Sequence, residues 1–351
     1  MKKKQWFAYL AGMVALVALA LWARGHIHFQ WNVFRDQIQH VNWALIVLGV
    51  GMIYLGYVFR ALRWALLMRP QKRVSTFSLL GSQVIGFTGV ALFGRLADLV
   101  RPYLVARRTQ LSLTSQVGVY TVERMFDLAS MALIFAAALR FAPGLASLPH
   151  HDTLEHAALL GLLVAIALGL FAVAVRIAGR AVAGATERIL AALSPKLAGT
   201  VAGKILAFRD GLNAVGGVDD FLLILVVSLA MWGMIVVAYL ATMRSFLLSP
   251  QLSNISLARV LVLMAASMAG SIIFLPVVGW FTQIAVLATA MTELFNVPSE
   301  PALGCAAMLL LVTFLSVVPV GLLWARFEHI SVKRVSEESE MAAEETTRAP
   351  V

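Results

Sequence analysis

The chain has 351 residues, of which 60% are hydrophobic and 13% are charged, and it carries a formal net charge of +10. Soluble globular domains carry about 25% charged residues, so this composition excludes a soluble domain and predicts an all-α polytopic membrane protein. The basic residues gather at the ends of apolar stretches, where they orient helices and meet anionic lipid, so we expect no nucleic-acid partner. The one cysteine, Cys305, excludes an internal disulfide and is expected to be a small buried residue.

The first apolar stretch long enough to cross a membrane is Trp6–Ala23, since a span needs about 20 residues. Lys2–Lys4 precede it, and the positive-inside rule keeps them in the cytoplasm. Ala18–Ala20 resembles a signal-peptide cleavage site, but the apolar run continues past it, which favours an uncleaved span. After an outer loop, Val41–Phe59 is the second span and returns to the cytoplasm.

A polar, glycine-rich segment, Ser78–Phe93, follows the second span after a basic group. That group comprises Arg60, Arg63, Arg69, Lys72 and Arg73. If Ser78–Phe93 crossed completely, the arginines of residues 95–108 would lie outside, against the positive-inside rule. We therefore predict a re-entrant hairpin, because polar backbone at membrane depth is tolerated where it is buried in protein or lines a cavity.

Four further spans bring the predicted number to six: Gln116–Leu139, His156–Val175, Phe221–Met243 and Ala302–Trp324. Between them, residues 259–295 are interrupted around Pro276–Gly279 and predict a second hairpin or two short helices. The two interrupted segments enter from opposite sides, so an inverted repeat is one interpretation, although no residue-level repeat is visible.

The domain organisation follows from these spans. Residues 1–325 are expected to form one transmembrane domain, within which 176–220 is a basic, amphipathic cytoplasmic segment. Residues 326–351 are rich in Glu and Ala and are expected to be a disordered cytoplasmic tail. Both termini are then cytoplasmic, and the basic N-terminus is typical of a bacterial inner-membrane protein.

Three ionisable residues, Glu123, Arg124 and Asp127, stand near the beginning of an otherwise apolar span. Glu123 and Asp127 are four apart and share a helix face, and Arg124 and Asp127 are three apart and can pair. Such groups cost about 2.5–3.5 kcal/mol inside a membrane unless they are paired or in a wet cavity. They either fix helix packing as an internal ion pair or line a substrate path, and we favour the path.

Arginines near the first hairpin supply a second set of candidates. Arg95, Asp98 and Arg101 recur every three residues and would share one helix face. Arginine binds phosphate or carboxylate through its planar fork; the alternative is a juxtamembrane cluster that only orients the helix. Arg60 and Trp64 are four apart, and their alternative role is anchoring in the interfacial aromatic belt.

The sequence contains no Walker-type loop, G-x-S-x-G, H-E-x-x-H or CxxC motif. Its histidines fall mainly in the predicted outer regions, but pairs such as His151/Glu155 and Asp152/His156 do not supply the three or four converging ligands of a metal site. We therefore expect no metal, no cofactor and no enzymatic activity.

Three motifs occur in order: Arg60-Ala-Leu-Arg-Trp64, Gly94-Arg-Leu-Ala-Asp-Leu-Val-Arg-Pro-Tyr103 and Val122-Glu-Arg-Met-Phe-Asp127. Together they resemble the R-x-x-R-W, RxGExxRP and ER-x-x-D pattern of the lysylphosphatidylglycerol synthase transmembrane-region family, also called flippase-like membrane proteins. The resemblance spans roughly residues 40–325. The chain departs from the pattern at Ala97-Asp98, where the family has Gly-Glu, and at Leu275–Gln283, which lacks the glycines of the family's Pro-Gly-Gly-x-Gly stretch.

The sequence holds no aminoacyl-transferase domain, so the resemblance implies a lipid-handling membrane module and not a synthase. It implies translocation of a lipid with an anionic or bulky head, such as a phospholipid, a polyprenyl-linked lipid or a hopanoid. The alternatives are a non-transporting partner that presents a lipid to a separate glycosyl- or aminoacyl-transferring enzyme, and a small intramembrane enzyme, which we do not favour. Besides the lipid, a membrane enzyme or a second copy of the chain is an expected partner. The predicted substrate-binding residues are Arg60, Arg95, Asp98, Arg101, Glu123, Arg124 and Asp127.

Overall fold

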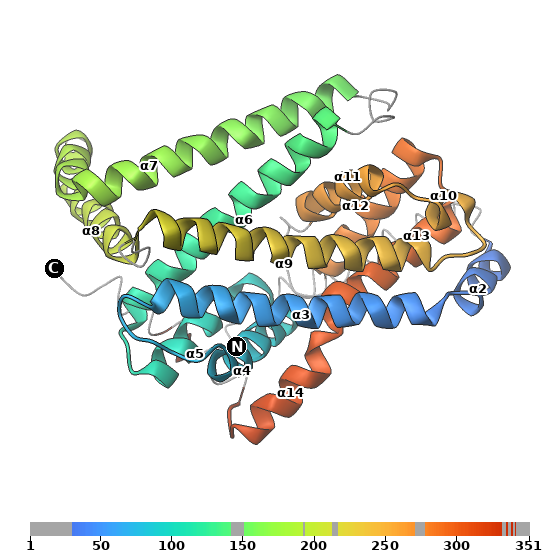
Figure 1. Cartoon of the computed structure of the whole chain (residues 1–351), viewed down its shortest axis with the longest axis horizontal. Coiled ribbons are helices and arrows are strands. Elements are labelled where there is room, and N and C mark those ends of the chain that lie inside the picture. Colours follow the sequence, from blue (N-terminus) through green and yellow to red (C-terminus); the bar gives the residue numbers. More distant parts are fainter. Residues whose placement is uncertain are drawn as a thin grey trace. The chain divides into compact units, whose positions relative to one another are not determined.

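The computed structural model describes residues 30–141, 151–191, 194–212, 217–270 and 278–331, together with Val335, Glu338, Ser339 and Met341. The described residues form helices and no named strand, which confirms the all-α class (Figure 1). Four of the helical stretches are long and apolar enough to cross a membrane: Trp43–Met68, Thr76–Phe93, Asp219–Arg244 and Ser299–Phe327. The predicted first span, Trp6–Ala23, lies outside the described residues.

The described elements follow one another along the chain with short connections. They are α2 (Trp31–Gln39), α3 (Trp43–Met68), α4 (Thr76–Phe93), the 3-10 helix η1 (Gly94–Leu99), α5 (Val100–Thr109), α6 (Leu113–Phe141), α7 (His151–Ala191), α8 (Pro195–Leu212), α9 (Val218–Arg244), α10 (Pro250–Ser253), α11 (Leu257–Gly270), α12 (Val278–Phe295), α13 (Ser299–Leu310), the π-helix η2 (Leu311–Leu315) and α14 (Val317–Phe327).

The chain divides into two compact units. The first comprises Met1–Gly51 and Val236–Leu315, and the second comprises Met52–Ile235 and Ser316–Val351. In the first unit, α11 and α12 pack against each other, as expected for the second interrupted segment, although residues 271–277 lie outside the described part. Cys305 on α13 is buried, as predicted.

The first predicted hairpin lies in the second unit, but its break is not where the sequence suggests. α4 is an unbroken helix, and the chain turns at Gly94, whose φ of 72° is readily adopted only by glycine. η1 and α5 then fold back onto α4. A Cβ atom at Gly86 would overlap the side chain of Arg101, and one at Gly89 would lie 3.4 Å from Ala97. These glycines therefore serve close helix packing and do not interrupt the helix.

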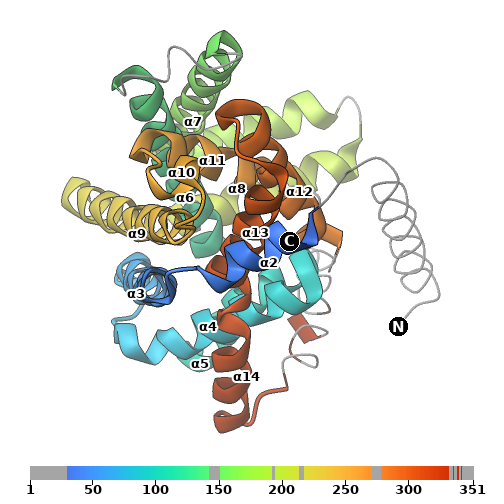
Figure 2. The ribbon, with the colours of Figure 1, turned by 90° about the vertical axis from the view of Figure 1, so that its right-hand side faces the viewer.

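Small residues also bring α14 against α4, and the two helices lie side by side in both views (Figures 1 and 2). Thr88 on α4 donates its hydroxyl to the carbonyl oxygen of Val84 at 2.9 Å and to that of Val317 at 3.3 Å. A Cβ at Gly321 would overlap Thr88, and one at Gly81 would overlap Trp324. α14 is therefore fixed to the hairpin by contacts that a larger residue at either glycine would prevent.

The core of the second unit contains buried apolar residues from α3, α6, α8 and α9, including Leu67, Val122, Ile205 and Ile224. The segment predicted to be amphipathic, 176–220, is formed by the end of α7, by α8 and by the beginning of α9. α7 and α8 pack together, and α7 continues through a kink at Ala178. These helices cover the core on which the candidate site is built.

Candidate functional site

Arg63 on α3 lies at the centre of a buried polar cluster in the second unit. Its Nη2 atom donates to Glu123 Oε1 at 2.7 Å, and its Nη1 atom donates to Asp127 Oδ1 at 2.7 Å and to Ser228 Oγ at 3.1 Å. The side chain of Arg63 is fully buried, and those of Glu123 and Asp127 are 1% and 10% exposed. One guanidinium group thus joins α3, α6 and α9.

Arg101 on α5 brings the hairpin to the same carboxylate. Its Nη1 atom lies 3.2 Å from Glu123 Oε2, and it also donates to Gln83 Oε1 at 3.3 Å. The guanidinium carbon lies 4.4 Å from the ring centroid of Phe87 and 5.2 Å from that of Tyr120, within the range of cation–π attraction. Arg101 is therefore held by a charge, an amide and aromatic faces.

Two further arginines lie toward the accessible side of this cluster. Arg124 Nη2 contacts Asp127 Oδ2 at 2.9 Å, and its side chain is 41% exposed. Arg60 Nη1 is 3.9 Å from Glu123 Oε1, too far for a hydrogen bond, and this buried atom has no hydrogen-bond partner among the described residues. The guanidinium carbon of Arg60 lies 4.8 Å from the ring centroid of Phe87.

We call these six residues the arginine–carboxylate cluster: Arg60, Arg63, Arg101, Glu123, Arg124 and Asp127. Four guanidinium groups face two carboxylates, which leaves a formal excess of two positive charges. An unbalanced charge in a low-dielectric interior is costly, so the cluster is suited to bind an anion. Arginine forks match phosphate and carboxylate groups, and the unpaired Nη1 of Arg60 is a donor that such a group can occupy.

The model of the lysylphosphatidylglycerol synthase TM region matches residues 9–321. This range includes α3, α5 and α6, the helices that supply the charges of the cluster. The chain belongs to this family. It is therefore an integral, multi-pass membrane protein that acts on lipid. No curated protein and no solved structure matches the chain.

In this member of the lysylphosphatidylglycerol synthase TM-region family, the structure unites five of the seven predicted site residues. Arg60, Arg101, Glu123, Arg124 and Asp127 all belong to the cluster. The predicted pairing of Arg124 with Asp127 is confirmed, and Glu123 and Asp127 share the helix face that meets Arg63.

The other two predicted residues belong to η1. Asp98 forms no ion pair with another described residue, but it lies close enough to Arg124 and Tyr120 to interact with them electrostatically. The side chain of Arg95 lies outside the described part of the structure, so its substrate role stays a prediction. Among the described residues, no group of three or more His, Cys, Asp or Glu is placed to hold a metal ion.

Sequence reasoning missed Arg63, which it assigned to the cytoplasmic basic group because the span was predicted to end at Phe59. α3 continues to Met68, so both Arg60 and Arg63 belong to the helix. Their spacing of three residues was the available signal, since it places both on one helix face. Trp64 is buried and donates Nε1–H to Gln116 Oε1 at 3.0 Å, so it is a core residue and not an interfacial anchor.

Proposed function

We propose that the protein translocates a lipid with an anionic headgroup across the membrane, and that the headgroup binds at the arginine–carboxylate cluster. The observation that carries this proposal is the buried Nη1 atom of Arg60, which has no hydrogen-bond partner among the described residues although it belongs to a cluster of four arginines and two carboxylates within a membrane domain. Ionisable groups inside membrane segments are rare and mark pathways for polar or charged substrates. We take the substrate to be a lipid because the chain belongs to the lysylphosphatidylglycerol synthase TM-region family.

The roles within the cluster follow from exposure and partners. Arg124 and Arg60 are the arginines left to hold a phosphate or carboxylate, because the Arg124 side chain reaches the surface and the buried Nη1 atom of Arg60 lacks a hydrogen-bond partner among the described residues. Glu123 positions the arginines by contacting Arg63 and Arg101. The proposed activity is binding and movement of the lipid in a bacterial inner membrane, without a covalent step.

The experiment that tests this proposal measures headgroup exposure in proteoliposomes. Fluorescent phosphatidylglycerol is reconstituted with the protein, and an impermeant quencher reports how fast the inner headgroups reach the outer leaflet. We expect rapid protein-dependent exposure in the wild type and a rate about tenfold lower in Arg60→Gln, corresponding to about 1.4 kcal/mol of lost headgroup binding. Because Arg60 makes no hydrogen bond in the cluster, the variant is expected to fold.

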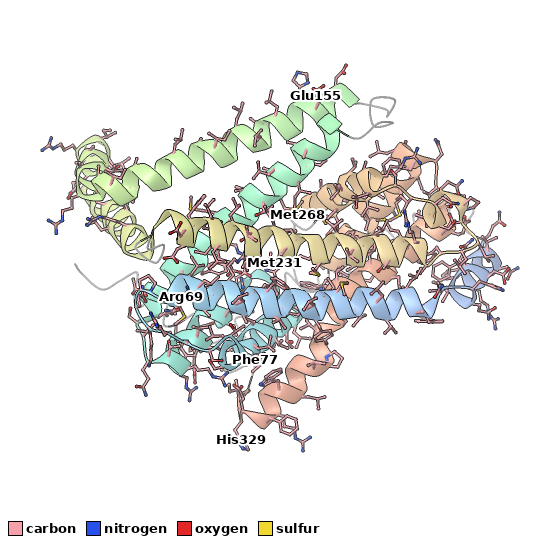
Figure 3. All side chains as sticks on the ribbon, viewed as in Figure 1. Arg69, Phe77, Glu155, Met231, Met268 and His329 are labelled. Atoms are coloured by element: carbon pink, nitrogen blue, oxygen red, sulfur yellow. The ribbon has the colours of Figure 1, made fainter. Side chains whose placement is uncertain are left out.

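The matched control is Arg69→Gln. Arg69 directly follows the C-terminal residue of the same helix, is exposed and is not part of the cluster (Figure 3). Equal rates in Arg60→Gln and wild type would contradict the proposed site. If the wild type moved none of several anionic lipids, the translocator proposal would be contradicted, and co-purification of a membrane enzyme would then support the lipid-presenting alternative.

A further inference from the structure

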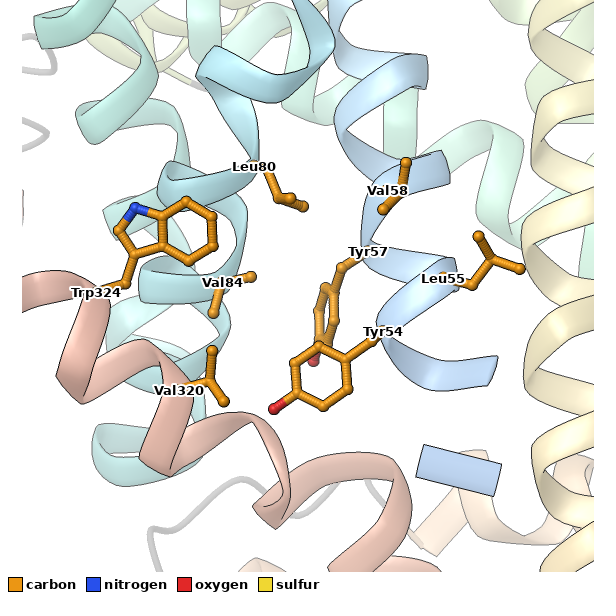
Figure 4. A pocket seen from close by; sticks show the side chains of 8 residues that line it. All are labelled: Tyr54, Leu55, Tyr57, Val58, Leu80, Val84, Val320 and Trp324. Carbon is orange, nitrogen blue, oxygen red and sulfur yellow. The ribbon is translucent and has the colours of Figure 1, made fainter. Parts of the chain in front are cut away.

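A cavity of about 300 Å³ lies in the second unit between α3, α4 and α14 (Figure 4). Two tyrosines, one tryptophan and five aliphatic side chains line it. Ligand pockets typically begin at about 300 Å³, so the cavity has room for part of a small molecule. Leu55 at its edge is 38% exposed, so the cavity opens at the surface of the unit.

Two of the three polar side-chain groups in the lining, those of Tyr54 and Trp324, are directed to partners in the protein. Tyr54 donates its hydroxyl to the carbonyl oxygen of Ser316 at 2.9 Å, and Trp324 donates Nε1–H to Glu328 Oε1 at 3.0 Å. The rings themselves remain as cavity wall. A buried water needs two to four polar partners, whereas apolar cavities accept apolar ligands. The lining therefore favours hydrocarbon.

This apolar cavity is adjacent to the arginine–carboxylate cluster. The ring of Tyr57, which lines the cavity, lies 5.2 Å from the ring of Phe87, and the guanidinium groups of Arg60 and Arg101 lie over that same Phe87 ring. Tyr57 and Arg60 are three residues apart on α3, a rise of about 4.5 Å. An apolar wall and an unpaired arginine donor are thus separated by less than one helical turn.

We infer that the cavity holds one hydrocarbon chain of a lipid whose phosphate or carboxylate headgroup lies at Arg60. The inference rests on the proposed function and adds to it the path of the chain, between α3, α4 and α14. The complementary ligand is an amphiphile, such as an anionic phospholipid, whose anionic group lies within a few ångström of the beginning of its hydrocarbon. A neutral lipid with the same chain fills the cavity but lacks the arginine contact.

The test is photo-crosslinking of the full chain in phosphatidylcholine vesicles that contain phosphatidylglycerol with a diazirine in one acyl chain. Mass spectrometry of peptides from α3 and α14 locates the adducts. We expect adducts at Tyr54, Tyr57 or Trp324 in the wild type. Val320→Trp places an indole in the cavity and should lower these adducts about tenfold, corresponding to a loss of about 1.4 kcal/mol.

Leu323→Trp is the matched control on the same helix, because Leu323 is 57% exposed and does not line the cavity. It should label as the wild type does. Leu80→Trp fills the same cavity from α4 and replaces Val320→Trp if that variant elutes as misfolded protein. Equal adduct yield in the wild type and in a folded cavity-filling variant would overturn the inference.

A diacylglycerol with the same diazirine chain separates a bound lipid from general lipid contact. Wild type should give about tenfold fewer adducts with this neutral probe, and Arg60→Gln should lower the anionic probe to the same level. Equal labelling by both probes would overturn the headgroup assignment. Labelling reports occupancy and not movement: cavity adducts in a protein that moves no lipid would support the inference while contradicting translocation, and Arg60-dependent movement without cavity adducts would do the reverse.

Discussion

Arg63 and Arg60 are three residues apart, but their partners predict different consequences of substitution. Arg63 is fully buried between Glu123 and Asp127, whereas Arg60 makes no hydrogen bond. Removing one partner of a buried ion pair costs about 3–5 kcal/mol, because the remaining charges stay buried without compensation. We expect Arg63→Gln to lower the melting temperature strongly in detergent, as measured by thermal unfolding of the purified protein.

The control series for this prediction uses the same helix. Arg63→Lys keeps the charge but loses the planar fork that reaches two carboxylates, so its stability should lie between wild type and Arg63→Gln. Arg69→Gln removes an exposed arginine and should change the unfolding free energy by no more than about 0.5 kcal/mol. If Arg63→Gln had the same melting temperature as the wild type, the ion pairs would contribute no net stability and Arg63 would act in binding alone.

At the scale of elements, the hairpin of α4, η1 and α5 depends on glycine. A Cβ at Gly86 would overlap the side chain of Arg101 and lie 3.2 Å from its Cα, so a rotamer change of Arg101 does not remove the conflict. Gly86→Ala should push α5 away from α4 and draw Arg101 from Glu123. We expect loss of thermal stability together with slower lipid movement, measured on the same preparation.

Gly51→Ala on α3 is the counterpart, because a Cβ there meets nothing within 4 Å. Glycine within a helix is less stable than alanine by about 0.5–1 kcal/mol, so this variant should be slightly more stable than the wild type and equally active. Wild-type stability and activity in Gly86→Ala would show that the hairpin tolerates separation and that its close packing is not needed.

The same glycines show where sequence reasoning reaches its limit. Apolar length and flanking charge are local properties, so the helices and the all-α class follow from the sequence. Whether glycine breaks a membrane helix or admits a neighbouring one depends on that neighbour, which the sequence does not reveal. The segment Ser78–Phe93 was therefore expected to contain the break, whereas the chain turns at Gly94 and its glycines meet α5, η1 and α14.

The candidate site, too, was predictable only where the relevant residues are close together in the sequence. Residues within one motif, such as Glu123, Arg124 and Asp127, were predicted together because their helical spacing is visible in the sequence. Arg63 was missed because charges ordinarily mark the end of a span, and only the carboxylates of α6 and the hydroxyl of Ser228 on α9 make its burial tolerable. A charge compensated by a distant segment is not recognisable from its own surroundings.

For the molecule as a whole, each of the two units contains a helical hairpin, α4 with α5 in the second and α11 with α12 in the first. Hairpins in corresponding halves are typical of transporters with inverted repeats and a binding site near the midplane. The inverted repeat and the side of the membrane on which each hairpin begins remain predictions. The side on which the first hairpin begins determines which leaflet supplies the lipid to the cluster.

The membrane orientation of the first hairpin can be read by cysteine accessibility, because Cys305 is buried and Cys305→Ser provides a background without cysteine. Arg73 and Arg107 are exposed and lie on either side of α4 and the turn at Gly94. The positive-inside rule places both in the cytoplasm, so a maleimide that does not cross membranes should label Arg73→Cys and Arg107→Cys only after cells are permeabilised. Asp36→Cys, on α2 just before the N-terminal end of α3, should be labelled in intact cells. Labelling of Arg107→Cys but not Arg73→Cys in intact cells would show that α4 crosses completely, and the headgroup would then approach the cluster from the outer leaflet.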